Sequence, residues 1–410
     1  MTKELKPKLR FPSFEHEWTT TKLKDVSNYQ KGFAFKSEDY RCSGARIIRV
    51  SDLSADSIKL DNEKIYIDQV NVSKYGRYII NSGEVIITTV GSRPHLKESA
   101  VGRAIFVEKG EEHLLNQNLL KLEFDDENVS NFIFRYLNSP RYIDYITSIQ
   151  RGNANQSNIA VKDLLEYPLS ITSKEEQHKI ADFLSSVDNK ICLLKEKYDL
   201  LTQYKKGVMQ KLFKQEIRFK DDNGNDFPDW ESVTLNHLMT ESRIKGSTGD
   251  KARKMTVKLW GKGVFEKDDK LGGSENTQYY KRKSGQFIYS KLDFLNCAFG
   301  IVPDELDGLE TTVDLPCFDI ESGINKYFIL EYIKQKRFYK KYGDMADGSR
   351  KAKRIHAETF LNFPVNLPCE KEQDKIADFL TAIDKKLDAV NRQVELTQTF
   401  KKGLLQQMFV

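Results

Sequence analysis

Apolar residues recur at alternating intervals of four and three positions in two stretches of this chain. The first stretch runs from Ile180 to Leu212 and the second from Ile376 to Met408. A period of 3.5 residues is that of a coiled-coil seam, so we expect two long helices that pair with each other. The alternative is an amphipathic surface helix on each of two separate domains, but such helices rarely keep so strict a period. The predicted seam consists of Ile180, Leu184, Val187, Ile191, Leu194, Leu201, Val208, Ile376, Leu380, Ile383, Leu387, Val390, Val394 and Leu404.

Capping residues and glycines qualify this helix prediction. Ser173 followed by Glu176 predicts a capping box at the start of the first helix, whereas Cys369 in the serine position predicts a weaker cap for the second. Gly207 and Gly403 lie inside the helical pattern, where glycine costs about 1 kcal/mol relative to alanine. These glycines either admit a closely packed partner helix or mark frayed helix ends.

The two helical stretches are copies of each other. Glu176–Lys190 recurs as Glu372–Lys386, so counterparts lie 196 positions apart (372 minus 176), and the match continues to Phe213 and Phe409. Aligned without gaps, 16 of these 38 positions are identical. The chain therefore contains an internal duplication.

The duplication also includes the start of each copy. Arg10-Phe11 before Trp18 matches Arg218-Phe219 before Trp230, and we expect both tryptophans in the core. Between these matching frames, the two middle parts have diverged almost completely. This contrast suggests a constant scaffold that carries two different recognition surfaces.

Both middle parts predict an α+β fold, because short strands bounded by turn residues precede a helix in each. The overall prediction is two globular α+β domains separated by two long helices that pair as an antiparallel coiled coil, a pseudo-two-fold dumbbell. The predicted boundaries are 1–165 for the first domain, 166–215 for the first long helix, 216–362 for the second domain and 363–410 for the second long helix. The predicted elements are strands near Arg46–Val50, Glu84–Ile87, Gln286–Tyr289 and Asp314–Ile320, and helices over Val129–Ser148 and Asn325–Tyr342.

Composition narrows the classes of function. The five cysteines are odd in number and never form a C-x-x-C pair, which favours reduced thiols in a cytoplasm over disulfides or zinc. The six histidines show no ligand spacing, so we expect no metal site. We also expect no signal peptide or membrane span. The net charge of +5 is small, so a nucleic-acid surface would have to be a local patch.

Loops of both middle parts combine basic residues with arginine, asparagine and glutamine. Basic groups suit phosphates, and these three side chains suit the edges of guanine and adenine. For any single residue, a solvated surface loop is the competing interpretation. The candidates in the first middle part are Lys31, Lys36, Ser92, Arg93, His95, Arg103, Arg151, Asn153, Asn155 and Gln156. Those in the second are Lys245, Ser247, Arg253, Lys258, Lys262, Lys291, Arg350, Lys351, Lys353 and Arg354.

Taken together, these features resemble the specificity subunits of type I restriction-modification systems over nearly the whole chain. The resemblance lies in the two EQ-x-KIADFL segments, in Asn158-Ile159 before the first of them, and in Tyr167-Pro168-Leu169. Phe363-Pro364-Val365 is the second version of this last motif, whereas Arg354-Ile355 departs from the Asn-Ile form.

The resemblance implies two target-recognition domains, each of which reads half of a bipartite, asymmetric site in double-stranded DNA. It also implies two modification (methylase) subunits on the helices, with ATP-dependent translocase and nuclease subunits in the full complex. S-adenosylmethionine, ATP and Mg are expected in those partners and no cofactor in this chain, which has no phosphate-loop or adenine-methylase motif. The rival hypotheses are an enzyme, a nuclease or DNA methyltransferase with its own recognition domain, and a DNA-binding regulator that uses the helices for protein contacts only.

Overall fold

The computed structural model divides the chain into two compact units. Unit 1 comprises residues 1–196 and 391–410, and unit 2 comprises residues 197–390. The structure describes residues 5–54, 57–96, 100–108, 113–124, 127–152, 156–268, 273–344 and 354–410. No helix in these ranges is both long and apolar enough to cross a membrane.

Two long helices contribute to both units. They are α5 (Lys174–Phe213) and α9 (Glu370–Gln407), which confirms the two predicted helices. In unit 1 the start of α5 packs against the end of α9, and in unit 2 the end of α5 packs against the start of α9. This is the antiparallel arrangement expected from the seam.

The apolar seam also holds one ion pair in each unit, and the two pairs are counterparts under the duplication. In unit 2 the Lys205 ammonium lies 2.7 Å from both carboxylate oxygens of Asp384. In unit 1 Lys401 lies 2.5 Å from Asp188. The lysine that interrupts the apolar pattern is therefore neutralised by an aspartate of the other long helix.

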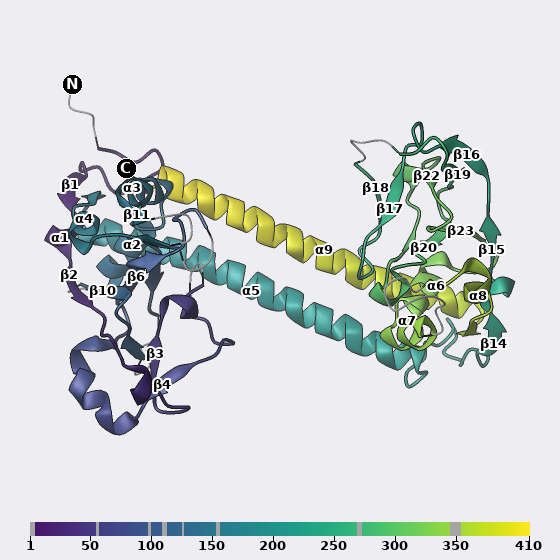
Figure 1. Cartoon of the computed structure of the whole chain (residues 1–410), viewed down its shortest axis with the longest axis horizontal. Coiled ribbons are helices and arrows are strands. Elements are labelled where there is room, and N and C mark those ends of the chain that lie inside the picture. The colour runs from purple at the N-terminus through teal and green to yellow at the C-terminus, as the bar shows by residue number, and fades with distance from the viewer. Residues whose placement is uncertain are drawn as a thin grey trace. The chain divides into compact units, whose positions relative to one another are not determined.

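Unit 1 is built on an antiparallel four-stranded sheet in the order β2-β10-β6-β8, with α2 beside it (Figure 1). A second four-stranded sheet, β4-β3-β9-β5, extends this unit, and β1 pairs with β13, the strand that directly precedes α5 in the sequence. The strands of unit 1 are β1 (Thr19–Lys22), β2 (Asn28–Lys31), β3 (Ala45–Ile48), β4 (Ile65–Ile67), β5 (Ile79–Ile80), β6 (Val85–Thr88), β7 (Val90–Gly91), β8 (Ala104–Phe106), β9 (His113–Leu115), β10 (Leu119–Glu123), β11 (Arg151–Gly152), β12 (Ser157–Asn158) and β13 (Pro168–Ile171). Its shorter helices are α1 (Leu23–Val26), α2 (Glu127–Tyr136), α3 (Pro140–Ile149) and α4 (Val161–Leu165).

Unit 2 repeats this frame with the sheet β15-β23-β20-β21 and the pair β14-β24. It differs in its additional strands, which form the sheets β16-β19-β22 and β17-β18. Its strands are β14 (Glu231–Thr234), β15 (Met239–Ser242), β16 (Lys245–Thr248), β17 (Met255–Val257), β18 (Val264–Glu266), β19 (Gln278–Lys281), β20 (Phe287–Tyr289), β21 (Phe299–Ile301), β22 (Glu310–Thr311), β23 (Cys317–Ile320) and β24 (Pro364–Leu367). Its shorter helices are α6 (Lys326–Ile333), α7 (Lys336–Gly343) and α8 (Ala357–Leu361).

The predicted single helix of each middle part is wrong, because each is two helices. In unit 1, α2 ends at Tyr136 and α3 begins at Pro140, where Ser139 caps α3 by accepting a hydrogen bond from the Tyr142 amide. Proline in the first turn of a helix lacks the amide that would continue the preceding one. In unit 2 the chain breaks at the corresponding place, between Ile333 and Lys336.

Each domain is anchored to the long helices by an equivalent aromatic cluster. Phe409 packs against Phe132 and Tyr136 of α2, with ring centroids 5.4 and 5.2 Å away. Its counterpart Phe213 packs in the same way against α6. Trp18 is 2% exposed in this cluster, which confirms its predicted place in the core.

The predicted capping box is only half formed. The Glu176 amide donates to Ser173 Oγ at 3.4 Å, but its carboxylate accepts two hydrogen bonds from Arg10 at 2.7 and 2.8 Å. Glu372 is bound in the same way by Arg218, at 3.1 and 2.7 Å. The duplicated arginine near the start of each copy thus ties that segment to the long helix.

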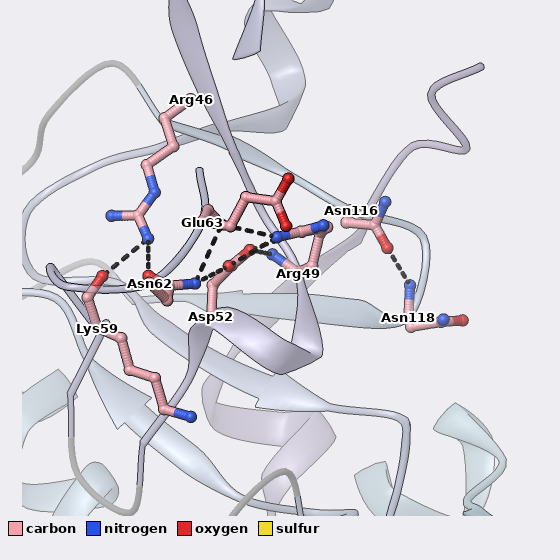
Figure 2. Close-up of polar contacts among 8 residues, drawn as sticks. All are labelled: Arg46, Arg49, Asp52, Lys59, Asn62, Glu63, Asn116 and Asn118. Carbon is pink, nitrogen blue, oxygen red and sulfur yellow. Dashed lines mark hydrogen bonds and ion pairs between the residues drawn. The ribbon is translucent and has the colours of Figure 1, made fainter. Parts of the chain in front are cut away.

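The second sheet of unit 1 is braced by a polar network (Figure 2). Asp52, which is fully buried, accepts two hydrogen bonds from the Arg49 guanidinium at 3.0 and 3.1 Å. Asn62 also donates to Asp52, and its own oxygen accepts from Arg46 at 3.1 Å. Because buried charges are stable only when paired, this network fixes the loop after β3.

Candidate nucleic-acid interface

Two loops singled out in the sequence lie side by side in unit 1. β12 pairs antiparallel with both β7 and β11, so one small sheet joins Val90–Gly91 to Arg151–Gly152. These loops are far apart in the sequence, and the pairing of Asn158 with Val90 brings them together. The structure thus brings together the described parts of two of the predicted loop groups.

The candidates in these loops differ in their surroundings. Arg93 and His95 are exposed, and their side chains have no polar partner within the described part of the chain. Arg151 pairs with Asp163 at 2.7 Å, and Arg103 donates to the Leu96 carbonyl at 3.0 Å. Ser92 is half-buried and Gln156 is exposed.

A cleft of about 560 Å³ lies between β2, β7, β12 and α4, and we name it the lysine cleft. It brings Lys31 from the third predicted loop group to the sheet just described. Lys36 of the same group is exposed and forms an ion pair with Glu38 at 3.3 Å. The lysine cleft is lined by Lys24, Tyr29, Lys31, Thr89, Val90, Gln117, Asn158, Ile159, Ala160, Val161, Lys162, Leu165 and Glu166.

One acidic residue offsets part of the positive charge of the lysine cleft. Hydrogen bonds from Lys22 and Lys24, at 2.6 and 2.7 Å, lower the pKa of Glu166 to about 2. Glu166 is therefore ionised, and the Lys24 ammonium is already paired with it. The ammonium groups of Lys31 and Lys162 have no such partner among the described residues, so they are the available cations of the cleft.

In unit 2 several candidates have intramolecular partners. Ser247 donates through its backbone amide and its hydroxyl to Glu310, at 2.7 and 3.0 Å. Arg253 pairs with Glu266 at 2.9 Å, and the Lys258 ammonium lies 4.0 Å from the centroid of the Phe265 ring. The remaining two candidates of this region, Lys245 and Lys262, are exposed.

Lys291 and Arg354 lie together in unit 2. Lys291 is 8% exposed, and burial lowers the pKa of its ammonium. The Ile355 amide donates to the Lys291 carbonyl at 3.1 Å, which places Arg354 beside this lysine. Arg354 Nε lies 3.6 Å from Asp314 Oδ1.

Five candidates lie outside the described residues: Asn153, Asn155, Arg350, Lys351 and Lys353. DNA contact by the others stays a prediction. The sequence reasoning did not select Lys24, Gln117, Asn158 or Lys162 as binding residues, although they line the lysine cleft. They come from separate elements, and no spacing in the sequence links them. Among the described residues, no group of three or more His, Cys, Asp or Glu side chains could hold a metal ion.

Comparison with known families gives one match over more than half of the chain. The family described as "Type I restriction modification DNA specificity domain" matches residues 15–203 and 316–398. A putative type I restriction enzyme MjaX specificity subunit from Methanocaldococcus jannaschii is 25% identical, over 95% of this chain and 92% of that protein. The type I restriction enzyme MjaVIII specificity subunit of the same organism is 24% identical, over 50% of this chain and 48% of that protein.

Solved structures show the same fold. The type I restriction-modification S subunit from M. genitalium aligns with a TM-score of 0.61 and 16% identity, over 99% of both chains. A chain from a study of complex assembly and conformational transition of the type I R-M system aligns with a TM-score of 0.55 and 14% identity, over 95% of this chain and 96% of that one.

Proposed function

Because the chain belongs to the type I restriction modification DNA specificity family, we propose that it is the DNA-reading subunit of such a complex, with one half-site read by each unit. The observation that carries the proposal is the repeated frame. Both units have the same four-stranded sheet and helix order, yet the strands added to that frame differ. A shared scaffold with two different surfaces suits the reading of an asymmetric, bipartite site.

We also propose that this chain is non-catalytic and holds no cofactor. S-adenosylmethionine would belong to the modification subunits, and ATP and Mg to the restriction subunits. This assignment of the cofactors to other subunits is supported by the lack of a phosphate-loop or adenine-methylase motif in the sequence.

The first test is therefore made on the purified chain. Alone, it should neither methylate nor cut DNA, and it should bind DNA weakly and mainly through phosphates. Radiolabelled methyl transfer and plasmid cleavage are measured after stringent removal of co-purifying methylase. Methyl transfer that persists in the pure chain would favour the rival enzyme hypothesis.

The surfaces that would carry the modification subunits are exposed apolar residues repeated on the long helices. On α5, Leu200 and Tyr204 are 58% and 53% exposed. On α9, their counterparts Leu396 and Phe400 are 60% and 54% exposed. Large apolar side chains repeated on the outside of two helices are typical of protein-binding surfaces.

One of the two helical glycines lies next to each of these surfaces, one turn further along the helix. A side chain added at Gly207 would meet no atom within 4 Å, and one added at Gly403 would meet only the end of Gln407 at 4.0 Å. Both glycines lie inside their helices, so they are not frayed ends. The repeated surface leaves room for a partner's backbone, which suits one modification subunit on each copy.

This docking proposal predicts a change in stoichiometry. Leu396→Glu with Phe400→Glu should reduce the number of bound modification subunits from two to one, and adding Leu200→Glu with Tyr204→Glu should remove both. Native mass spectrometry of the co-expressed complex gives the numbers. Thr202→Glu places a glutamate on a different side of α5 and should leave two subunits bound. If it releases a subunit as readily, the proposed surfaces are wrong.

A further inference from the structure

The lysine cleft holds two amide side chains as well as its lysines. Gln117 and Asn158 are exposed at its wall, and neither carboxamide has a polar partner within the described ranges. Gln117 lies in the short turn between β9 and β10. The turn is closed by the Leu119 amide, which donates to the Asn116 carbonyl at 2.9 Å, and Asn116 Oδ1 lies 3.5 Å from the Asn118 amide (Figure 2). The lysine cleft therefore presents hydrogen-bonding groups that nothing in the described chain uses.

The backbone around the lysine cleft is repeated in unit 2. In unit 1 the Thr89 amide donates to the Asn118 carbonyl at 2.9 Å, and the Thr89 carbonyl accepts from Ile159 at 3.0 Å. In unit 2 Lys291 makes the same two bonds, to the Asp314 carbonyl at 3.0 Å and from Ile355 at 3.1 Å. These bonds make Thr89 the counterpart of Lys291.

The side chains carried by this repeated backbone differ in character. Asn158 directly precedes Ile159, just as Arg354 directly precedes Ile355, so the two hold the same position. The first domain thus has a neutral carboxamide where the second has a guanidinium. Asp314 Oδ1 lies 3.6 Å from Arg354 Nε, and the Arg354 guanidinium donates no side-chain hydrogen bond in the described part of unit 2. A fixed backbone with exchanged polar groups is what two readers of different bases require.

We propose that the lysine cleft is the DNA-reading site of the first domain, and that Arg354 reads a guanine at the same place in the second. This inference rests on the proposed function. Lys31 and Lys162 contact backbone phosphates, and the carboxamides of Gln117 and Asn158 each read an adenine·thymine pair. The assignment follows from geometry, because a carboxamide matches the N6 and N7 groups of adenine and a guanidinium matches the O6 and N7 groups of guanine.

The reading residues are tested by methylome sequencing of a host that carries the whole complex. Gln117→Ala and Asn158→Ala should each weaken discrimination at one adenine·thymine pair of the first half-site, by roughly 10- to 100-fold. Arg354→Ala should do the same at one guanine·cytosine pair of the second half-site. If Gln117→Ala does not assemble, Gln117→Glu keeps the shape and should disfavour adenine, because a carboxylate cannot donate to N7. Assembled variants that leave the methylated sequence unaltered would overturn the assignment.

The lysines should behave differently. Lys31→Ala with Lys162→Ala should weaken binding to all sequences alike and reduce the slope of log affinity against log salt by roughly 0.9 per lost phosphate contact. The slope is measured on the complex with its methylase. Lys74→Ala is the matched control, because Lys74 is exposed in the same unit, does not line the cleft, and among the described residues bonds to Asn71 alone, at 2.8 Å. An unchanged slope in the double variant would show that the cleft faces away from DNA.

The complex with the wild-type chain distinguishes a failure of this inference from a failure of the proposed function. If the wild-type chain confers no defined methylated sequence on its host, the proposed function fails. If it does, and the cleft variants keep both half-sites and the salt slope, only the cleft assignment fails.

Discussion

Lys205→Glu is expected to lower the free energy of unfolding of unit 2 by about 3–5 kcal/mol, the cost of breaking a buried ion pair. Lys205 lies 2.7 Å from Asp384 and 3.3 Å from Glu331 of α6, and the side chains of Lys205 and Glu331 are only 14% and 9% exposed. The substitution would bring three carboxylates together. Lys334, 2.5 Å from Glu331, would be the one nearby cation left among the described residues.

The same change at the counterpart, Lys401→Glu, should cost far less, about 1 kcal/mol. The reason is that the domain residue facing this lysine has the opposite charge in the two units. Where α6 has Glu331, α2 has Arg135, whose guanidinium donates to Asp188, Asn131 and Ser185. Lys401→Glu would therefore still face a cation, so the two copies of one lysine should respond differently to one substitution.

Urea unfolding of the full chain, with hydrogen exchange in residues 197–213 and 391–407 to locate each loss, measures both effects. Adding Glu331→Arg to Lys205→Glu restores alternating charges and should recover most of the stability. Equal losses in the two single variants, or no recovery in the double variant, would contradict this account.

The scaffold could be predicted from the sequence because it is encoded locally and twice. The 3.5-residue period of apolar residues predicted α5 and α9, and the offset of 196 residues between the copies predicted the repeated frame. The break before Pro140 was missed because the apolar pattern continues across it, although Ser139-Pro140 is a recognisable helix start.

The lysine cleft could not be predicted in the same way. Lys31 enters it from β2, which pairs with β10, while Asn158 enters from β12, which pairs with β7. Such contacts depend on strand pairings between distant segments, which no local pattern specifies. Burial likewise separates residues that look alike in sequence, since Lys262 is exposed whereas Lys291 is buried.

The repeated anchor predicts that the second domain can replace the first. The exchange puts residues 239–356 in place of residues 28–160, from the start of β2 to the residue before α4. β1, β13, Trp18 and the Arg10–Glu176 pair are all retained. In unit 2, Phe328 and Tyr332 pack 5.7 and 5.5 Å from Phe213. In the exchanged chain they would meet Phe409, the counterpart of Phe213.

The charges at the anchor are also compatible with this exchange. Glu331 would replace Arg135 beside the Asp188–Lys401 pair and face Lys401, just as it now faces Lys205. The aspartate–lysine pair of the long helices can therefore pack against a domain that has either an arginine or a glutamate at this position. We expect the exchanged chain to fold and to bind its modification subunits.

Its methylated site should lose the present first half and contain the present second half twice, which is a complete change of one half-site with the other intact. Methylome sequencing of the host reads both halves directly. The matched control is an exchanged chain that also carries Glu331→Arg. This substitution restores the original positive charge at the anchor, and the chain should give the same methylated site as the exchanged chain without it. If the complex assembles but the original first half-site persists, sequence reading does not reside in residues 28–160. If both halves change, the two domains do not read DNA independently.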